Sequence, residues 1–247
     1  MGLILGTAKN AANAGESNWL VPRLGEASDD PKLWQGYRDM PQCRLCGAQC
    51  EVWTREFRMN LQRDPSDWYA KVAARAGAEV LVTSEKSPVT IRMLDPNLQN
   101  TTLVLFKSPL QYWASVQKRP WKTATLRASM TSWSKIYWQF LDEQTYNPAG
   151  GIVFLSLDKF QSDPANGVKR LAEKLSLPLD ESALKYWDTE QHYIGGNFNV
   201  YERVKTAEPE KLAVHSAPKP VSKSDREFIR SDRATAIYAK LVERSIL

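Results

Sequence analysis

The sequence predicts an α/β fold, in which a central parallel sheet is flanked by helices in three layers. Four short β-rich runs lead through a polar turn into a segment with helical periodicity: 2–6 (GLILG), 79–83 (EVLVT), 102–106 (TLVLF) and 151–155 (GIVFL). Apolar strands that alternate with helices are typical of a parallel sheet covered on both faces. We therefore expect these four strands to lie parallel in one sheet.

Length and composition indicate one globular domain over 1–247. The chain has 247 residues, of which 43% are hydrophobic, enough for a sizeable core. The segment at about 27–58 is rich in Cys, Trp and Pro and predicts an irregular insertion. Aromatic and aliphatic residues recur at helical spacing, which predicts a long helix over 121–143 that packs on the core. A closing helix is expected over 222–247.

The charge of the chain favours an anionic small molecule over nucleic acid. The 33 Lys and Arg residues exceed the 28 Asp and Glu residues by five, and the excess is spread along the sequence without a basic block. No apolar run reaches the ~18 residues of a membrane span. The apolar start lacks the basic region and cleavage site of a signal peptide. We expect no nucleic-acid or membrane partner, and a cytoplasmic location.

Three of the four strand-to-helix turns carry a lysine. Lys9, Lys86 and Lys107 follow the first, second and third predicted strands. In open parallel sheets, ligands bind at the carboxyl ends of the strands, where such turns meet. The three cations therefore indicate an anionic ligand at that edge.

The third of these turns has the most specific pattern, K-x-P-x5-S, formed by Lys107, Pro109 and Ser115. Proline is favoured at the first position of a helix, because its missing N–H is not needed there. Ser115 would then lie about two turns into the helix. The Lys107 ammonium and the Ser115 hydroxyl could together bind one phosphate group. An ordinary strand-to-helix turn would also account for the pattern.

This pattern resembles the 3′-phosphate-binding motif of sulfotransferases that use 3′-phosphoadenosine 5′-phosphosulfate (PAPS). The basic residue in that family is usually Arg, and Lys107 keeps the charge without the bidentate fork. The segment VLVTSEKSPVTIRML resembles the S-x-K-x-P segment of the bacterial and tyrosylprotein branches. The resemblance implies that Lys86 contacts the transferring sulfuryl group. An exposed turn lysine is the alternative interpretation of Lys86.

Two later segments extend the resemblance. Residues 152–180 are similar to the family's fourth strand, acidic-aromatic turn and following helix. HYIGGN, residues 192–197, resembles a glycine-rich loop of bacterial members that closes near the nucleotide, which implies contacts from Gly196 and Asn197. The four segments occur in the family's order between residues 79 and 197, and the resemblance implies a P-loop-type three-layer fold with a central parallel sheet flanked by helices.

The first turn departs from the family. Members commonly have K/R-S-G-T-T after the first strand, whereas this chain has GTAKNAANAGES. Thr7, Lys9 and Asn10 take the corresponding positions, and a helix from about Asn10 would offer free amides to the 5′-phosphosulfate. Lys9 would then join Lys86 as a catalytic cation. The sequence has no G-x4-G-K-[S/T], which argues against a kinase or ATPase.

The resemblance implies transfer of the sulfuryl group of PAPS to a hydroxyl or amine of a small-molecule acceptor, with release of 3′-phosphoadenosine 5′-phosphate (PAP). Such transfer depends on positioning and charge stabilisation and requires no metal. It needs a general base, for which Glu16, Glu26, Glu85 and His192 are the candidates. A nucleotide-binding protein of the same fold that has lost catalysis is the alternative.

The three cysteines of the chain fall within the eight residues CRLCGAQC, as Cys43, Cys46 and Cys50. Such spacing can bind zinc, but a tetrahedral site needs a fourth ligand. The two histidines, His192 and His215, are both distant in sequence. The sequence therefore leaves open a zinc-dependent binding module and a turn that buries three small thiols.

Overall fold

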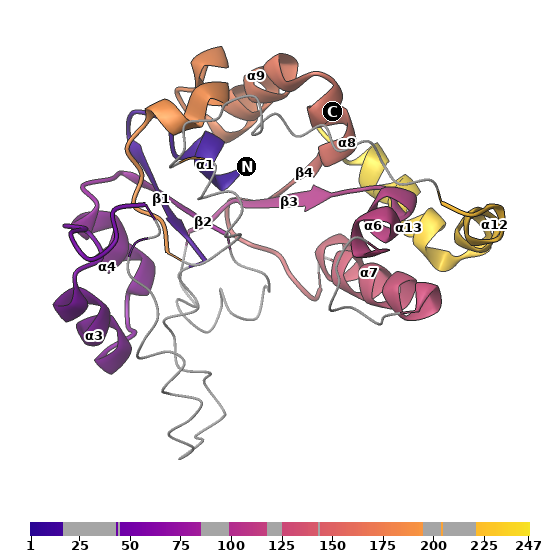
Figure 1. Ribbon diagram of the computed structural model, residues 1–247, viewed down its shortest axis with the longest axis horizontal. Coiled ribbons are helices and arrows are strands. Elements are labelled where there is room, and N and C mark those ends of the chain that lie inside the picture. Colours follow the sequence, from indigo (N-terminus) through magenta and orange to yellow (C-terminus); the bar gives the residue numbers. More distant parts are fainter. Residues whose placement is uncertain are drawn as a thin grey trace. The chain divides into compact units, whose positions relative to one another are not determined.

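The computed structural model describes residues 1–16, 43, 45–84, 99–117, 125–142, 144–194, 204 and 221–247 (Figure 1). The chain divides into two compact units. Unit 1 comprises Met1–Leu98 and Ser176–Ala213, and unit 2 comprises Gln99–Leu175 and Val214–Leu247. Each unit combines helices with a two-stranded parallel sheet, so the α/β class is confirmed. Among the described residues the strands form these two sheets and not one central sheet. The P-loop-type three-layer fold and the single domain stay predictions.

The sheet of unit 1 pairs β1 (Ala11–Gly15) with β2 (Val80–Thr83) in parallel, and β2 lies within the strand predicted at 79–83. The strand predicted at 2–6 is wrong, because Gly2–Leu5 forms the one-turn helix α1. A short, fully buried apolar run suits a helical turn as well as a strand, and periodicity cannot separate the two.

The helix predicted from about Asn10 is wrong as well. The residues after Asn10 form β1, whose Ala-Ala-Asn-Ala-Gly sequence has a low intrinsic preference for strand. Pairing with the β-branched residues of β2 holds this segment extended, from Ala11 opposite Val80 to Gly15 opposite Thr83. Tertiary contacts therefore override the local preference.

Unit 1 also contains α3 (Arg55–Arg63), α4 (Trp68–Arg75) and the 3-10 helix η2 (Glu181–Asp188). Thr54 caps α3, because its hydroxyl accepts the N–H of Phe57. The insertion predicted as irregular over about 27–58 is thus helical from Arg55 onward, and its part at 27–42 lies outside the described residues. Trp53, Leu61, Trp68 and Val72 are fully buried and form the centre of the local core.

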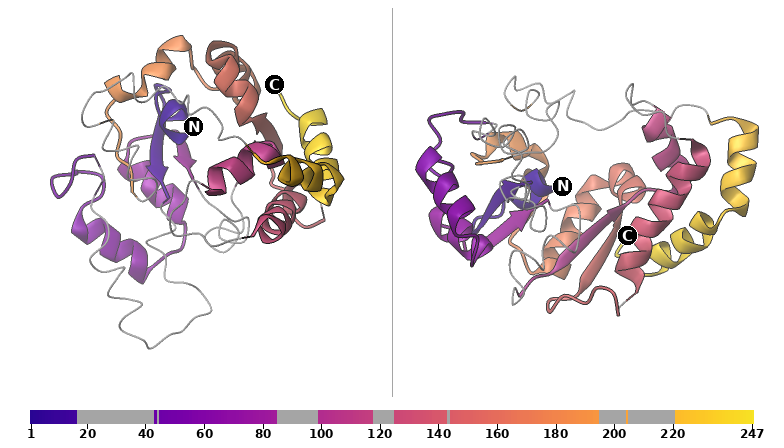
Figure 2. Two further views of the ribbon diagram at one scale, coloured as in Figure 1. Left: turned by 45° about the vertical axis from the view of Figure 1, so that its right-hand side comes forward. Right: turned by 90° about the horizontal axis from the view of Figure 1, so that it is seen from below.

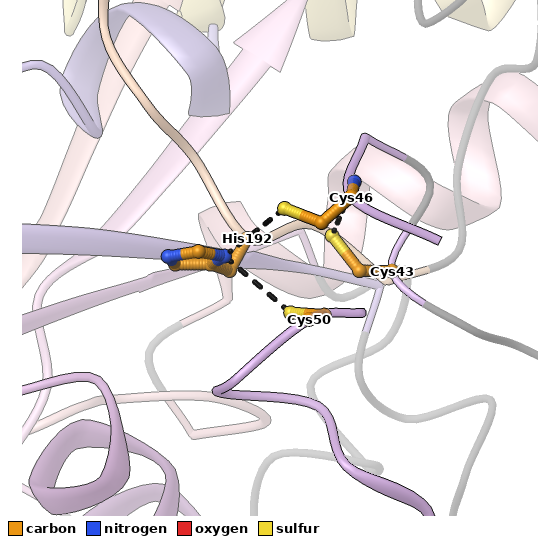
Figure 3. A group of neighbouring side chains, drawn as sticks. All are labelled: Cys43, Cys46, Cys50 and His192. Atoms are coloured by element: carbon orange, nitrogen blue, oxygen red, sulfur yellow. Dashed lines mark hydrogen bonds between the residues drawn. The ribbon is translucent and has the colours of Figure 1, made fainter. Parts of the chain in front are cut away.

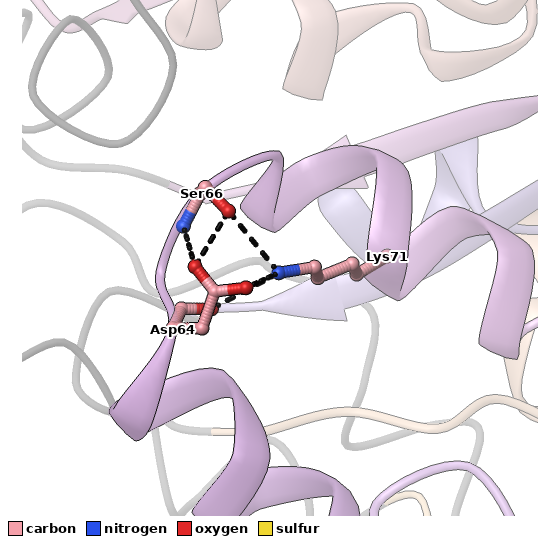
Figure 4. Close-up of polar contacts among 3 residues, drawn as sticks. All are labelled: Asp64, Ser66 and Lys71. Carbon is pink, nitrogen blue, oxygen red and sulfur yellow. Dashed lines mark hydrogen bonds and ion pairs between the residues drawn. The ribbon is translucent and has the colours of Figure 1, made fainter.

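The connection between α3 and α4 is held by Asp64, Ser66 and Lys71 (Figure 4). The Lys71 ammonium lies 2.6 Å from one carboxylate oxygen of Asp64, and the Ser66 N–H donates to the other at 3.2 Å. These contacts, that of Lys71 foremost, lower the pKa of the Asp64 carboxyl to about 2.

Lys71→Met is expected to raise the pKa of Asp64 toward the usual carboxyl value of about 3.9. Because the folded-state pKa is depressed, the pair contributes stability above the unfolded-state pKa and loses it as the pH falls toward 2. A carboxyl-detected NMR titration measures the shift. Lys71→Arg, which keeps a cation, is the control. An unchanged Asp64 pKa in Lys71→Met would contradict the role given to Lys71.

The sheet of unit 2 pairs β3 (Thr102–Phe106) with β4 (Ile152–Ser156) in parallel, and Figure 2 shows the two arrows running in the same direction. The strands predicted at 102–106 and 151–155 are therefore confirmed to within one residue. The helices of this unit are α6 (Pro109–Gln117), α7 (Leu126–Leu141), α8 (Leu157–Ser162), α9 (Pro164–Leu175), α12 (Lys223–Ser231) and α13 (Arg233–Glu243).

The long helix predicted over 121–143 is confirmed for the residues of α7, while 121–124 lie outside the described residues, and the inner face of α7 packs on the unit 2 core. Trp133 and Met130 are fully buried, and the Tyr137 hydroxyl donates to the carbonyl of Leu105 in β3 at 2.9 Å. The closing segment forms two helices instead of one, since Asp232 ends α12 and caps α13. Within the described part of the chain, no helix combines the length and apolar character needed to cross a membrane.

Candidate functional site

Polar side chains gather at the carboxyl end of the β1–β2 sheet in unit 1. Glu16 follows β1 directly and is 9% exposed, and Ser84 follows β2 directly. Tyr193 lies beside both residues. Its pKa is raised, mainly by burial and also by the Glu16 carboxylate, while a hydrogen bond with Ser84 partly offsets the rise. This is the edge at which parallel sheets bind ligands. Glu16 is the candidate base that lies at this edge of the sheet.

The segment that carries His192 is fixed against this sheet. Ile194 forms a parallel bridge with Gly15, with its N–H donating to the Ala14 carbonyl at 3.2 Å and its carbonyl accepting the Glu16 N–H at 2.7 Å. The buried Gln191 side chain donates to the Leu3 carbonyl at 2.9 Å. Residues on both sides of His192 are therefore anchored in the described part of unit 1.

Gly15→Ala is expected to destabilise the protein. Gly15 has φ +71°, and an added Cβ would lie 2.4 Å from the Ile194 carbonyl oxygen. The left-handed conformation alone costs a non-glycine residue roughly 1–2 kcal/mol, and the contact adds to this. Gly77→Ala is the matched control, since Gly77 has φ +64° but open space around its Cβ position. Urea denaturation should show a larger decrease in the free energy of unfolding for Gly15→Ala than for Gly77→Ala. Equal decreases in the two variants would contradict the close approach of Ile194 to Gly15.

The turn after β3 in unit 2 has the arrangement expected from the sequence. Lys107 follows the strand, and Pro109 is the first residue of α6. Ser108 caps this helix, because its hydroxyl accepts the Gln111 N–H at 3.3 Å, while its own N–H donates to Asp158 at 2.9 Å. Ser115 lies on the same helix, and both Ser115 and Lys107 are half-buried. The predicted strand end and helix start are thus confirmed.

The other residues predicted to bind the nucleotide are placed differently or lie outside the described residues. The Thr7 hydroxyl donates to the Ile4 carbonyl at 2.8 Å, and the Asn10 side chain donates to Glu79 at 3.1 Å. Lys9 is exposed. No helix begins at Asn10 to offer free amides, so that part of the predicted 5′-phosphosulfate site is wrong. Outside the described residues lie Lys86, Gly196 and Asn197, and the candidate bases Glu26 and Glu85.

The three cysteines and one histidine of unit 1 converge on one point (Figure 3). One ligand atom from each of Cys43, Cys46, Cys50 and His192 lies within 4.8 Å of all the others. The Nδ1 atom of His192 is 3.4 Å from the Sγ atoms of both Cys46 and Cys50. The four residues therefore lie close enough together to bind a metal ion, and His192 is the histidine that lies beside the three cysteines.

The backbone around the cysteines directs N–H groups at sulfur. Gly47, with φ +67°, lets the chain fold back after Cys46, and its N–H donates to the Cys43 carbonyl at 2.9 Å. The N–H of Cys46 lies 3.5 Å from the Cys43 sulfur, and that of Trp53 lies 3.3 Å from the Cys50 sulfur. Such N–H donors favour the thiolate form.

Two groups lie next to His192. The Trp53 indole N–H donates to the His192 carbonyl at 2.9 Å. The Nε2 atom of the imidazole, on the side away from the thiols, lies 3.9 Å from a Glu190 carboxylate oxygen. A carboxylate on the second nitrogen is common for histidines that bind metals, because it orients the ring and fixes its tautomer.

Burial, and to a smaller extent the neighbouring thiols, opposes the ionisation of Cys46 and Cys50. Burial, followed by the neighbouring Cys43, raises the pKa of Cys46 to about 12. Burial also raises the pKa of Cys50, although the N–H of Trp53 partly offsets it. Nearby, burial and Arg55 lower the pKa of Arg58, while Cys50 counteracts them. Several thiolates this close together need a cation to neutralise them.

The sequence patterns assign no role to three residues of these sites. Ser84 begins the S-x-K-x-P segment and Tyr193 lies in HYIGGN, but the roles of these two residues and of Gln191 depend on contacts with distant segments. The one local signal is that Ser84, like Glu16, is the first residue after a strand.

Comparisons of the chain with family models, with curated proteins and with solved structures found no match. The functional proposals below therefore depend on the residues and contacts of this chain.

Proposed function

We propose that the protein is a PAPS-dependent sulfotransferase that transfers the sulfuryl group to a hydroxyl or amine of a small-molecule acceptor. The unit of β3, turn and α6 is the main support for this proposal. Lys107 follows the strand directly, Pro109 begins the helix, and Ser115 lies about two turns along it. The order, spacing and secondary structure are similar to those of the family's 3′-phosphate-binding motif.

The chemistry of this turn suits a terminal phosphate. The nine-residue helix α6 has its positive dipole end beside Lys107, and a phosphate is stabilised at such a helix start. The Asp158 carboxylate accepts a hydrogen bond from the Ser108 N–H and so stabilises the turn. The Lys107 ammonium and the Ser115 hydroxyl then supply the charge and the hydrogen bond that bind the 3′-phosphate.

Catalysis needs cations for the transferring group and a base for the acceptor. Lys86 and the exposed Lys9 are the proposed cations. Glu16 is the base that the structure favours, since it is buried at the carboxyl end of β1 beside Tyr193. His192 is less suited to this role, because its Nδ1 atom faces two thiols.

Incubation with PAPS and a panel of phenols, aliphatic alcohols and amines tests the proposal. We expect PAP release that depends on the acceptor, together with a sulfated product detected by mass spectrometry. Adenosine 5′-phosphosulfate, which lacks the 3′-phosphate, is the control donor and should be used poorly. PAP binding without turnover on any acceptor would favour a nucleotide-binding protein that lacks catalysis. Neither binding nor turnover would contradict the proposal.

A further inference from the structure

We propose that Cys43, Cys46, Cys50 and His192 bind one zinc ion in a closed structural site that stabilises unit 1. This inference does not depend on the sulfotransferase proposal, because sulfuryl transfer from PAPS requires no metal. The contacts around the four side chains support it in four respects: spacing, ligand type, surrounding groups and position in the fold.

The spacing matches a single tetrahedral ion. Zinc binds thiolate sulfur at about 2.3 Å and imidazole nitrogen at about 2.0–2.1 Å, so at tetrahedral angles a sulfur and a nitrogen lie about 3.6 Å apart and two sulfurs about 3.8 Å apart. The two measured distances from the His192 Nδ1 atom to sulfur are 3.4 Å. The longest separation in the group is at most 4.8 Å, so closure requires a shift of about 1 Å.

The ligand types favour zinc among the available ions. Three thiolates and one imidazole form a soft set that suits Zn²⁺, whereas Mg²⁺ and Ca²⁺ prefer oxygen. The four ligand atoms are also too close together to surround a polynuclear iron–sulfur cluster. A tetrahedral Cys3His set is one of the usual structural zinc sites.

The groups around the site suit the charge of the complex. Three thiolates and Zn²⁺ leave one net negative charge, which Arg58 beside Cys50 can balance. The N–H groups of Cys46 and Trp53 are directed at the sulfurs of Cys43 and Cys50, respectively. The Nδ1 atom of His192 faces the sulfurs of Cys46 and Cys50, while the Glu190 carboxylate lies 3.9 Å from the other nitrogen.

The site is closed and cross-links distant parts of unit 1. With four protein ligands the ion has no open position for a substrate, which is the mark of a structural site. Cys43 and Cys50 are only 2% and 3% exposed. His192 is 142 residues beyond Cys50 in sequence, so the ion would close a long loop and stabilise the folded state by restricting the unfolded chain.

Metal analysis of the full-length protein tests the inference. We expect one zinc per chain, removal by a strong chelator, and a thermal midpoint that falls by several degrees on removal and recovers when zinc alone is added back. Cobalt should replace zinc and give the intense visible bands of a tetrahedral site with thiolate-to-cobalt charge transfer. A chain that takes up no stoichiometric zinc or cobalt, or that gives an octahedral cobalt spectrum, would overturn the inference.

Variants identify the ligands. Cys50→Ser should weaken zinc binding by more than about a hundredfold, since even changes beyond the ligands cost 10–100-fold, and His192→Ala should weaken it by at least about tenfold. His215→Ala changes the other histidine and should bind zinc like the wild type. His192→Cys keeps four ligands. In its cobalt-substituted form the thiolate-to-cobalt charge-transfer absorbance should increase by about a third, because the number of thiolate ligands rises from three to four. Unchanged affinity in His192→Ala, or unchanged absorbance in His192→Cys, would exclude His192 as a ligand and overturn the proposed site.

Discussion

Lys107→Ala is expected to weaken PAP binding by roughly ten- to a hundred-fold, because a charge-assisted hydrogen bond is worth about 1.5–3 kcal/mol. Ser115→Ala should have a smaller effect of the same kind. Adenosine 5′-phosphosulfate lacks the 3′-phosphate, so its weaker binding should hardly respond to either change. Calorimetric titration of both nucleotides against each variant measures the selectivity.

Lys135→Ala and Ser132→Ala are matched controls for this experiment. Both residues are exposed on α7 of the same unit, so the changes remove a lysine and a serine without touching the turn after β3. Their nucleotide binding should equal that of the wild type. Equal losses for the two nucleotides in Lys107→Ala would indicate a damaged fold. Wild-type binding of both nucleotides would remove Lys107 from the phosphate site.

Lys86→Ala is expected to reduce turnover by at least about a hundredfold, the usual cost of losing one group that stabilises transition-state charge. PAP affinity should change little, because the contact of Lys86 with the sulfuryl group strengthens in the transition state. Steady-state kinetics with PAPS, alongside PAP titration, separates the two quantities. Lys185→Ala, which removes an exposed lysine of η2, is the control. Wild-type turnover in Lys86→Ala would exclude Lys86 from the mechanism.

The strands that could be predicted are those whose own residues favour the extended state. The sequences VLVT, TLVLF and IVFLS of β2, β3 and β4 are rich in β-branched and aromatic residues, and each ends at a polar turn. β1 could not be predicted, because Ala, Asn and Gly do not favour strand and pairing with distant segments holds them extended. The same contacts explain why no helix begins at Asn10.

The Cys43, Cys46, Cys50 and His192 group could be predicted in part. The three cysteines are close in sequence, and their spacing allowed either a zinc site or a turn that buries three thiols. The fourth ligand could not be chosen, since spacing does not distinguish His192 from His215. The choice follows from the bridge between Gly15 and Ile194, which anchors the segment containing His192 in unit 1. This is a long-range contact with no local signature.

Titration of the unmodified protein with PAP and with adenosine 5′-monophosphate tests the sulfotransferase proposal most directly, because it requires no knowledge of the acceptor. The two nucleotides differ by the 3′-phosphate that Lys107 and Ser115 are proposed to bind. We predict that PAP binds at least about tenfold more tightly than adenosine 5′-monophosphate, which corresponds to about 1.4 kcal/mol of binding free energy. Raising the salt concentration should reduce this difference in affinity. Equal affinities for the two nucleotides, or no binding of PAP, would contradict the proposal.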